Sequence, residues 1–269
     1  MNQGVQKRIS HILFFIFLSA FFPVATKADT FFGEIQTGIT EIKDFKYPVH
    51  IFVPNNLKPE QRYPLVISLP TFGESSEENI AVWKSLANRK TWIVLSPTYL
   101  EPKDMPNDYD RWLIQLKAFV TSKYPVNPNK IYLIGKEKSA EYAGYLGVNF
   151  PEEFSAVALL GGSWVGKFEK LLRLQSRPSD QRPFFVALKE DQHELYQKTE
   201  PLAYEFNQKG YPVRLLRFEK GEEFLSSDFK KQVLDWLEEQ SEKWQMVVTK
   251  SQKTIKQRAH RAMKDFFTV

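Results

Sequence analysis

Short, mostly apolar runs recur along the chain and predict buried strands. They do not alternate between apolar and polar residues, which is typical of strands buried on both faces of a parallel sheet. The runs are Leu65–Leu69, Trp92–Leu95, Ile131–Ile134, Val157–Leu160 and Phe184–Leu188. Before them, residues 45–53 predict a further strand that ends at Pro54, which we expect to pair antiparallel as a lead-in to the sheet.

Segments with helical spacing separate these runs. In each, apolar residues stand three or four positions apart, which indicates a helix with one buried face. The segments are Ile80–Ala87, Trp112–Val120, Ala140–Gly147 and Phe229–Leu237. Ser75 and Glu78 have the spacing of a capping box at the start of the first segment. A repeated strand–helix order predicts an α/β fold with a mainly parallel sheet.

The loops after the predicted strands are the expected position of a site. In open α/β sheets, ligands bind beyond the carboxyl ends of the strands. These loops supply five candidate pocket residues, namely Thr71, Phe72, Lys138, Ser163 and Trp164. Phe72 and Trp164 equally suit the core, and the sequence leaves that choice open.

The sharpest motif follows the run at 131–134. That run ends at Gly135 and passes directly into a helical segment, as in the strand–turn–helix of a nucleophile elbow, written G-x-S-x-G. Glu137 occupies the nucleophile position, and Ser139 occupies the position of the second glycine.

Five segments, in order, resemble the α/β-hydrolase superfamily, and most closely secreted esterases of the feruloyl-esterase and polyhydroxybutyrate-depolymerase type. They are Pro64–Ser75, Asn129–Tyr145, Asn149–Ala158, Pro183–Asp191 and Phe218–Phe224. The resemblance covers roughly residues 45–240. It implies an α/β-hydrolase-like three-layer sandwich with a mainly parallel sheet and an antiparallel N-terminal lead-in.

The resemblance also implies that the oxyanion loop lies within Pro64–Ser75, which includes the candidate Thr71, and it implies where a catalytic triad would lie. The order serine, acid, histidine falls on Glu137, Asp191 and Glu222, so only the acid is retained. Losing triad members removes most of the rate. The leading prediction is therefore an exported, non-catalytic pseudo-hydrolase that binds an unknown small molecule or protein through its degenerate cleft or its basic tail. The alternative is an active secreted carboxylesterase with an atypical site, for example one that uses Ser139, His193 or Glu137 itself.

Three converging carboxylates predict an electrostatic problem, because like charges at close range repel. Lysines stand beside each of them, so one interpretation is an ion-pair network. The other is a site for a hard divalent cation such as Ca²⁺ or Mg²⁺, held by Glu137, Asp191 and Glu222. The sequence indicates no organic cofactor.

The ends of the chain differ from its body. Residues 1–28 resemble a signal peptide, with Lys7 and Arg8 before an apolar run and small residues up to Ala28. We expect export to a periplasmic or extracellular location, with an uncleaved anchor as the alternative. The chain contains no cysteine, which favours a bacterial periplasm.

The positive net charge of +5 also belongs to the ends. Residues 243–269 contain seven lysines and arginines against one aspartate, and the predicted domain at 29–242 is acidic. No nucleic-acid partner is therefore expected. Within the tail, Ile255, Ala259, Ala262, Met263 and Phe266 form one helical stripe. Residues 250–267 could contact an anionic membrane or an acidic partner, pack on the body, or remain partly disordered.

Overall fold

The structure is a computed structural model that describes residues 35–58, 60–100, 104–105, 107–219 and 224–267. In the last helix, side chains are described up to Lys250 and at Lys253 and Thr254. The predicted signal peptide at 1–28 therefore lies outside the described residues. The predicted boundary between domain and tail, at residue 243, falls inside a continuous helix.

A single sheet of eight strands forms the centre of the fold, in the order β1-β2-β4-β3-β5-β6-β7-β8. The first two strands, β1 (Gly38–Glu41) and β2 (Val49–Val53), pair antiparallel, and β2 is also antiparallel to β4. The parallel strands are β3 (Tyr63–Leu69), β4 (Ile93–Pro97), β5 (Val126–Lys136), β6 (Ala156–Leu160), β7 (Phe184–Leu188) and β8 (Val213–Arg217). The expected mainly parallel sheet with an antiparallel lead-in is confirmed.

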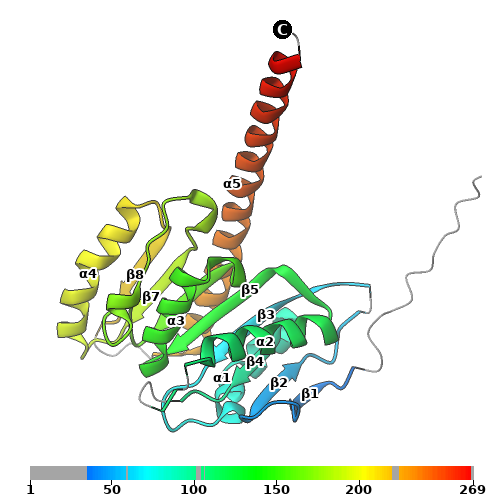
Figure 1. Ribbon diagram of the computed structural model, residues 1–269. Helices are drawn as coiled ribbons and strands as arrows, with labels where there is room; N and C mark the ends of the chain where they lie inside the picture. The colour runs from blue at the N-terminus through cyan, green and yellow to red at the C-terminus, as the bar shows by residue number, and fades with distance from the viewer. Residues whose placement is uncertain (1–34, 59, 101–103, 106, 220–223, 268–269) are drawn as a thin grey trace, which may run out of the picture. The chain divides into compact units, whose positions relative to one another are not determined.

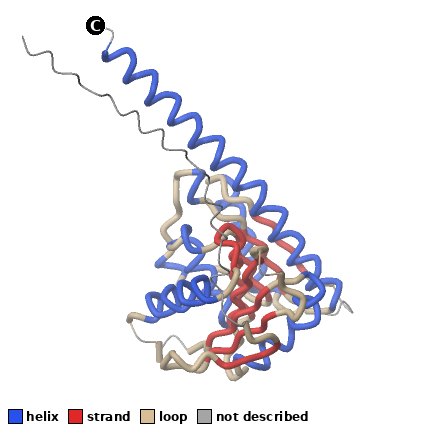
Figure 2. Tube along the Cα trace, turned by 90° about the vertical axis from the view of Figure 1, so that its right-hand side faces the viewer, coloured by secondary structure: helices blue, strands red, loops and turns tan. Residues whose placement is uncertain are grey.

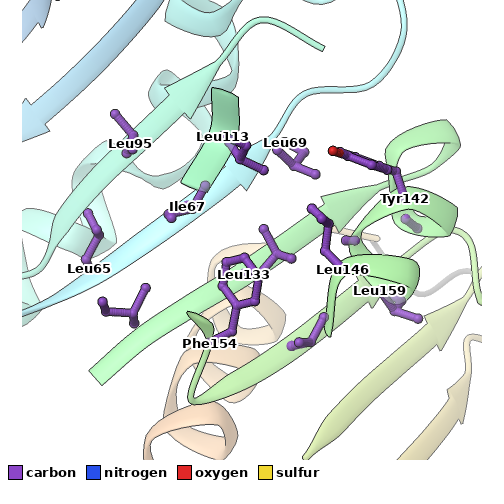
Figure 3. Close-up of a cluster of buried hydrophobic side chains, with 14 of the residues drawn as sticks. Leu65, Ile67, Leu69, Leu95, Leu113, Leu133, Tyr142, Leu146, Phe154 and Leu159 are labelled. Atoms are coloured by element: carbon purple, nitrogen blue, oxygen red, sulfur yellow. The ribbon is translucent and has the colours of Figure 1, made fainter. Parts of the chain in front are cut away.

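Helices cover both faces of the sheet, which confirms the three-layer sandwich (Figures 1 and 2). One face carries α2 (Tyr109–Lys123), α3 (Lys138–Asn149) and α4 (His193–Gln208). The other carries α1 (Ser76–Lys90) and the first part of α5 (Ser227–Phe267). One apolar core lies between the sheet and each of the two helical layers. Figure 3 shows part of the first core, where Leu133 and Leu159 of the sheet lie near Leu146 of α3.

Most predicted elements are present, with revised boundaries. The capping box of α1 forms as expected, since Ser75 accepts from the Glu78 N–H and Glu78 accepts from the Ser75 N–H. The lead-in strand is shorter than predicted, because residues 45–47 form a bend before β2 begins at Val49. Strand β1 and helix α4 were not predicted. Helix α4 contains Pro201, a residue that normally indicates a helix end.

Helix α5 runs along the sheet from the carboxyl ends of the parallel strands to their amino ends. Near its start, Phe229 packs edge-on against Phe218, which follows β8. Further along, the Trp244 indole donates to the Pro178 carbonyl and lies under the Arg182 guanidinium, 3.7 Å from ring centroid to Cζ. Gln245 then donates to the carbonyl of Asn129, in the first half of β5.

Candidate functional site: the elbow and the loops around it

The turn between β5 and α3 has the backbone of a nucleophile elbow. Glu137 lies between the two elements with φ 49° and ψ −110°, a conformation that non-glycine residues rarely adopt and that costs on the order of 1–3 kcal/mol. Gly135 permits the close approach of α3, since a Cβ there would lie 2.6 Å from the Ala143 Cβ. The predicted elbow is therefore formed, with a glutamate at its apex.

Ser139 is a structural residue of this turn. Its side chain is fully buried. Its hydroxyl accepts from the Lys136 N–H at 2.9 Å and lies 3.0 Å from the carbonyl oxygens of Leu69 and Lys136, to either of which it can donate. The hydroxyl thus ties the end of β3 to the elbow, and burial keeps it from an external substrate.

The Glu137 carboxylate is held by groups from two neighbouring loops. One oxygen pairs with the Lys189 ammonium after β7, and the other accepts from the Thr71 hydroxyl at 3.2 Å. The hydrogen bond from Lys189 is the main reason that the pKa of Glu137 lies below its ordinary value, although partial burial opposes this shift. Glu137 is therefore an ionised carboxylate at neutral pH.

The loop after β3 is held by a hydrogen bond between two of its own residues, Thr71 and Glu74. One Glu74 oxygen accepts from the Thr71 backbone N–H at 3.0 Å, and the other accepts from the Lys136 ammonium at 2.6 Å. In α/β-hydrolases, an N–H of this loop helps to stabilise the oxyanion. Here the Thr71 N–H already binds a carboxylate, so it is not free to bind a reacting carbonyl oxygen.

The loop after β7 presents a lysine and a glutamine toward the elbow, whereas Asp191 is exposed. Gln192 accepts from the Lys189 N–H at 2.8 Å and donates to the Gly161 carbonyl at 2.7 Å. Within the described residues, Asp191 makes no hydrogen bond or ion pair. Its predicted triad partner Glu222 lies outside those residues.

Phe224, in the loop after β8, lies close to the elbow. The Lys189 ammonium lies 5.3 Å from the centroid of its ring. A Cβ added at Gly161 would lie 3.2 Å from the Glu137 Cγ and 3.5 Å from both the Lys189 Cε and the Phe224 ring. The loops after β5, β6, β7 and β8 therefore converge around Glu137.

The five predicted pocket residues divide between surface and core. Phe72 is 58% exposed, Lys138 is exposed, and Thr71 is half-buried beside Glu137. Ser163 is fully buried and accepts from the Thr199 hydroxyl at 2.7 Å. Trp164 is fully buried and packs against Phe184 and Phe206. The question left open for Trp164 is thus settled, because its ring belongs to the core.

Two histidines, His50 and His193, have described side chains, and each contacts a residue outside the elbow. His193 begins α4, is exposed and contacts Gln197 of the same helix. His50 of β2 is hydrogen-bonded to the Ser76 hydroxyl at 2.7 Å, but Ser76 is only 3% exposed. No carboxylate in the described part of the chain bonds to His50, so this pair does not complete a Ser–His–acid triad there.

The divalent-cation site remains a prediction. Across residues 35–267, apart from the undescribed positions, no group of three His, Cys, Asp or Glu residues is placed to hold a metal ion; Glu222 is one of those positions. The Lys189 ammonium already neutralises Glu137, as the ion-pair interpretation expects. Calorimetric titration with Ca²⁺ and Mg²⁺, repeated on Glu137→Gln, tests the cation site: heat that depends on Glu137 supports it.

Sequence reasoning missed the roles of Glu74 and Gln192. Each is a polar side chain that folds back to a backbone N–H three residues earlier, at Thr71 and at Lys189. The spacing is that of a capping box, which is the signal that would have identified both residues.

The sequence matches no protein-family model and no curated protein. Solved structures do match. An α/β-hydrolase enzyme from a Medee basin deep-sea metagenome library superposes with a TM-score of 0.60 at 15% identity, over 76% of this chain and 98% of that one. A ferulic acid esterase gives 0.55 at 15% identity, over 75% and 98%.

A thermostable esterase gives a TM-score of 0.55 at 22% identity, over 75% of this chain and 62% of its own length, so this chain spans less than two thirds of that protein. At these identities the likeness concerns the fold. The order of strands, the elbow and these neighbours lead to one conclusion: the chain has the α/β-hydrolase fold, the fold of the esterases among these neighbours.

Proposed function

We propose that this protein is an exported, non-catalytic member of the α/β-hydrolase fold that binds a small molecule or a protein at the rim around Glu137. One observation carries the proposal. The apex of the elbow, where a hydrolase of this fold keeps its nucleophile, holds a carboxylate paired with Lys189 and Thr71.

Two further observations support the loss of catalysis. An ester hydrolase needs donors that stabilise the oxyanion, and the Thr71 N–H is bound to Glu74. It also needs an accessible nucleophile beside a base, and both Ser139 and Ser76 are buried. Binding is retained in the proposal because Phe72, Lys138 and the partly exposed Glu137–Lys189 pair leave an apolar group and charges of both signs at the rim.

The test is hydrolysis of a short p-nitrophenyl ester together with labelling by a fluorophosphonate probe. We expect a rate equal to that of buffer and no labelled band, alongside an active esterase as a positive control. The matched variants are Ser139→Ala and Ser76→Ala. Hydrolysis or labelling that either variant abolishes, while its thermal melt shows that it is still folded, would establish a serine esterase and overturn the non-catalytic assignment.

The exported location rests on the residues of the N-terminal segment. Lys7, Arg8 and the apolar run that follows have the composition of a signal peptide. Mass spectrometry of the protein recovered from an expressing bacterium tests this part separately. We expect an N-terminus at Asp29 and a periplasmic fraction; an intact Met1 in the cytoplasmic fraction contradicts it.

A further inference from the structure

The basic half of α5 leaves the body at the edge of the sheet opposite the elbow. The elbow lies at the carboxyl ends of the parallel strands. By contrast, Trp244 and Gln245 contact Pro178, Arg182 and Asn129, which lie toward the amino ends of β7 and β5. Among the described side chains, Gln245 is the last one of α5 that hydrogen-bonds to the body.

The helix continues well beyond that contact. Residues 246–267 remain α-helical, which at about 1.5 Å per residue corresponds to about 33 Å of helix. At its beginning, Met246 is 64% exposed and Val247 is 50% exposed. None of the helices in the described part of the chain is both long enough and apolar enough to cross a bilayer.

The apolar stripe of this half continues the face of α5 that packs on the body. Leu237, Ser241 and Trp244 make that packed face. Counting on by three or four residues along the same row leads to Val248, then to the polar position Ser251 or Gln252, and then to Ile255, Ala259, Ala262 and Phe266. The side chains after Thr254 lie outside the described residues. The row is therefore assigned from the register of residues along the described helical backbone.

Positive charge occupies most of the remaining circumference. Residues 243–269 have a net charge of +6, with Asp265 as the one acidic residue. Two such helices would repel each other, which argues against a second copy as the partner. An apolar row flanked by lysines and arginines is the composition of a helix that lies in the interface of an anionic bilayer.

The chain also enters the sheet at this edge. Gly38 pairs with Val53, the last residue of β2, and the preceding residue, Phe52, pairs with Val94 near the start of β4. The N-terminal boundary of the fold and the free half of α5 therefore lie at the amino ends of the strands, away from Glu137.

We infer that residues 246–267 bind an anionic lipid surface as an amphipathic helix. The inference does not depend on whether the rim is catalytic. An acidic protein partner would use the same charges but would not require the apolar row.

The experiment is co-sedimentation of the purified chain with vesicles of phosphatidylcholine alone or containing phosphatidylglycerol. We expect pelleting only with the anionic vesicles, and weaker pelleting as salt increases. A chain that ends at Gln245 keeps every described hydrogen bond between α5 and the body, so it should fold, as judged by its thermal melt. Equal pelleting of the two chains would overturn the inference.

A triple variant and a double variant separate the contribution of charge from that of the apolar row. Lys256→Gln combined with Arg258→Gln and Lys264→Gln should lower the partition coefficient on the order of 100-fold, because each basic residue near an anionic surface contributes about fivefold. Ile255→Asp with Phe266→Asp should lower it at least about tenfold. Lys167→Glu with Lys170→Glu, at two exposed positions on the body, is the control and should bind as the parent does. Binding that survives loss of the apolar row contradicts insertion and indicates a purely electrostatic contact.

Discussion

Two lysine–glutamate pairs flank the elbow, and they differ in how far water reaches them. On the side of the loop after β3, Lys136 and Glu74 are 6% and 17% exposed. On the side of β7, Lys189 and Glu137 are 34% and 43% exposed. A mostly buried pair fixes geometry, and breaking it leaves an uncompensated charge. An exposed pair contributes little to stability.

The difference assigns separate roles to the two sides of the rim. The Lys136–Glu74 pair belongs to the framework, because Glu74 also holds the Thr71 N–H and keeps the loop closed. The Glu137–Lys189 pair can be opened by a ligand at small energetic cost. A ligand that carries a charge of either sign would compete for one of its members, so recognition is expected on the β7 side.

The largest expected effect comes from breaking the buried pair. Lys136→Met leaves the Glu74 carboxylate without its cation, and we expect the free energy of unfolding to fall by about 3 kcal/mol. Urea denaturation measures this change. Lys138→Met, at the exposed neighbouring position, is the control and should change it by less than about 0.5 kcal/mol. Equal losses for the two variants would contradict the framework role.

Ser139→Ala is expected to cost less. The variant removes the acceptor for the Lys136 N–H and the donor for a carbonyl of Leu69 or Lys136, all buried, so we expect a loss of about 2 kcal/mol. Ser122→Ala removes an exposed hydroxyl of α2 and should be nearly neutral. If Ser139→Ala were as stable as Ser122→Ala, the tie between β3 and the elbow would be unimportant.

The strain at the apex predicts that Gly is more stable than Ala at Glu137, whereas the order is reversed at an ordinary helical position. At Glu137, both Ala and Gly remove the exposed ion pair, but only Gly tolerates the positive φ without strain. We expect Glu137→Gly to be about 1 kcal/mol more stable than Glu137→Ala. At the exposed helical position Lys198, Gly should be less stable than Ala by about the same amount. The four chains are compared by urea denaturation, and the same order at both sites would exclude strain at the elbow.

The smallest effect concerns the exposed pair and depends on pH. The pKa of Glu137 is lowered in the folded protein, chiefly by Lys189, whereas the unfolded carboxyl titrates near about 4.3. The stabilisation is therefore present above that pH and is lost as pH falls through the folded pKa. Glu137→Gln should lower the free energy of unfolding by less than about 1 kcal/mol at pH 7.

The difference between Glu137→Gln and the parent should vanish below the folded pKa, as measured by urea denaturation across the acid range. Glu194→Gln, which breaks an exposed pair within α4, is the control. A difference that persists at low pH would show that Glu137 stabilises the elbow through packing and not through charge.

The fold could be predicted to a large extent because its strands are buried on both faces. Runs such as Ile131–Ile134 are apolar throughout, and the Ser75–Glu78 cap marks where α1 begins. Strand β1 was missed because it is short, at the sheet edge and only half-buried. Helix α4 was missed because Pro201 interrupts its pattern.

The sequence by itself determined that an elbow forms at Gly135 and that a carboxylate, Glu137, occupies its apex. Both follow from local order along the chain, in which a buried strand, a glycine and a helix succeed one another. Only the tertiary structure decided which lysine neutralises Glu137, that Glu74 binds the Thr71 N–H, and that Asp191 is exposed while Gln192 bridges to Gly161. The physical reason is that these contacts join loops after different strands, so their geometry is set by sheet register and loop conformation, which the spacing of residues along the chain does not encode.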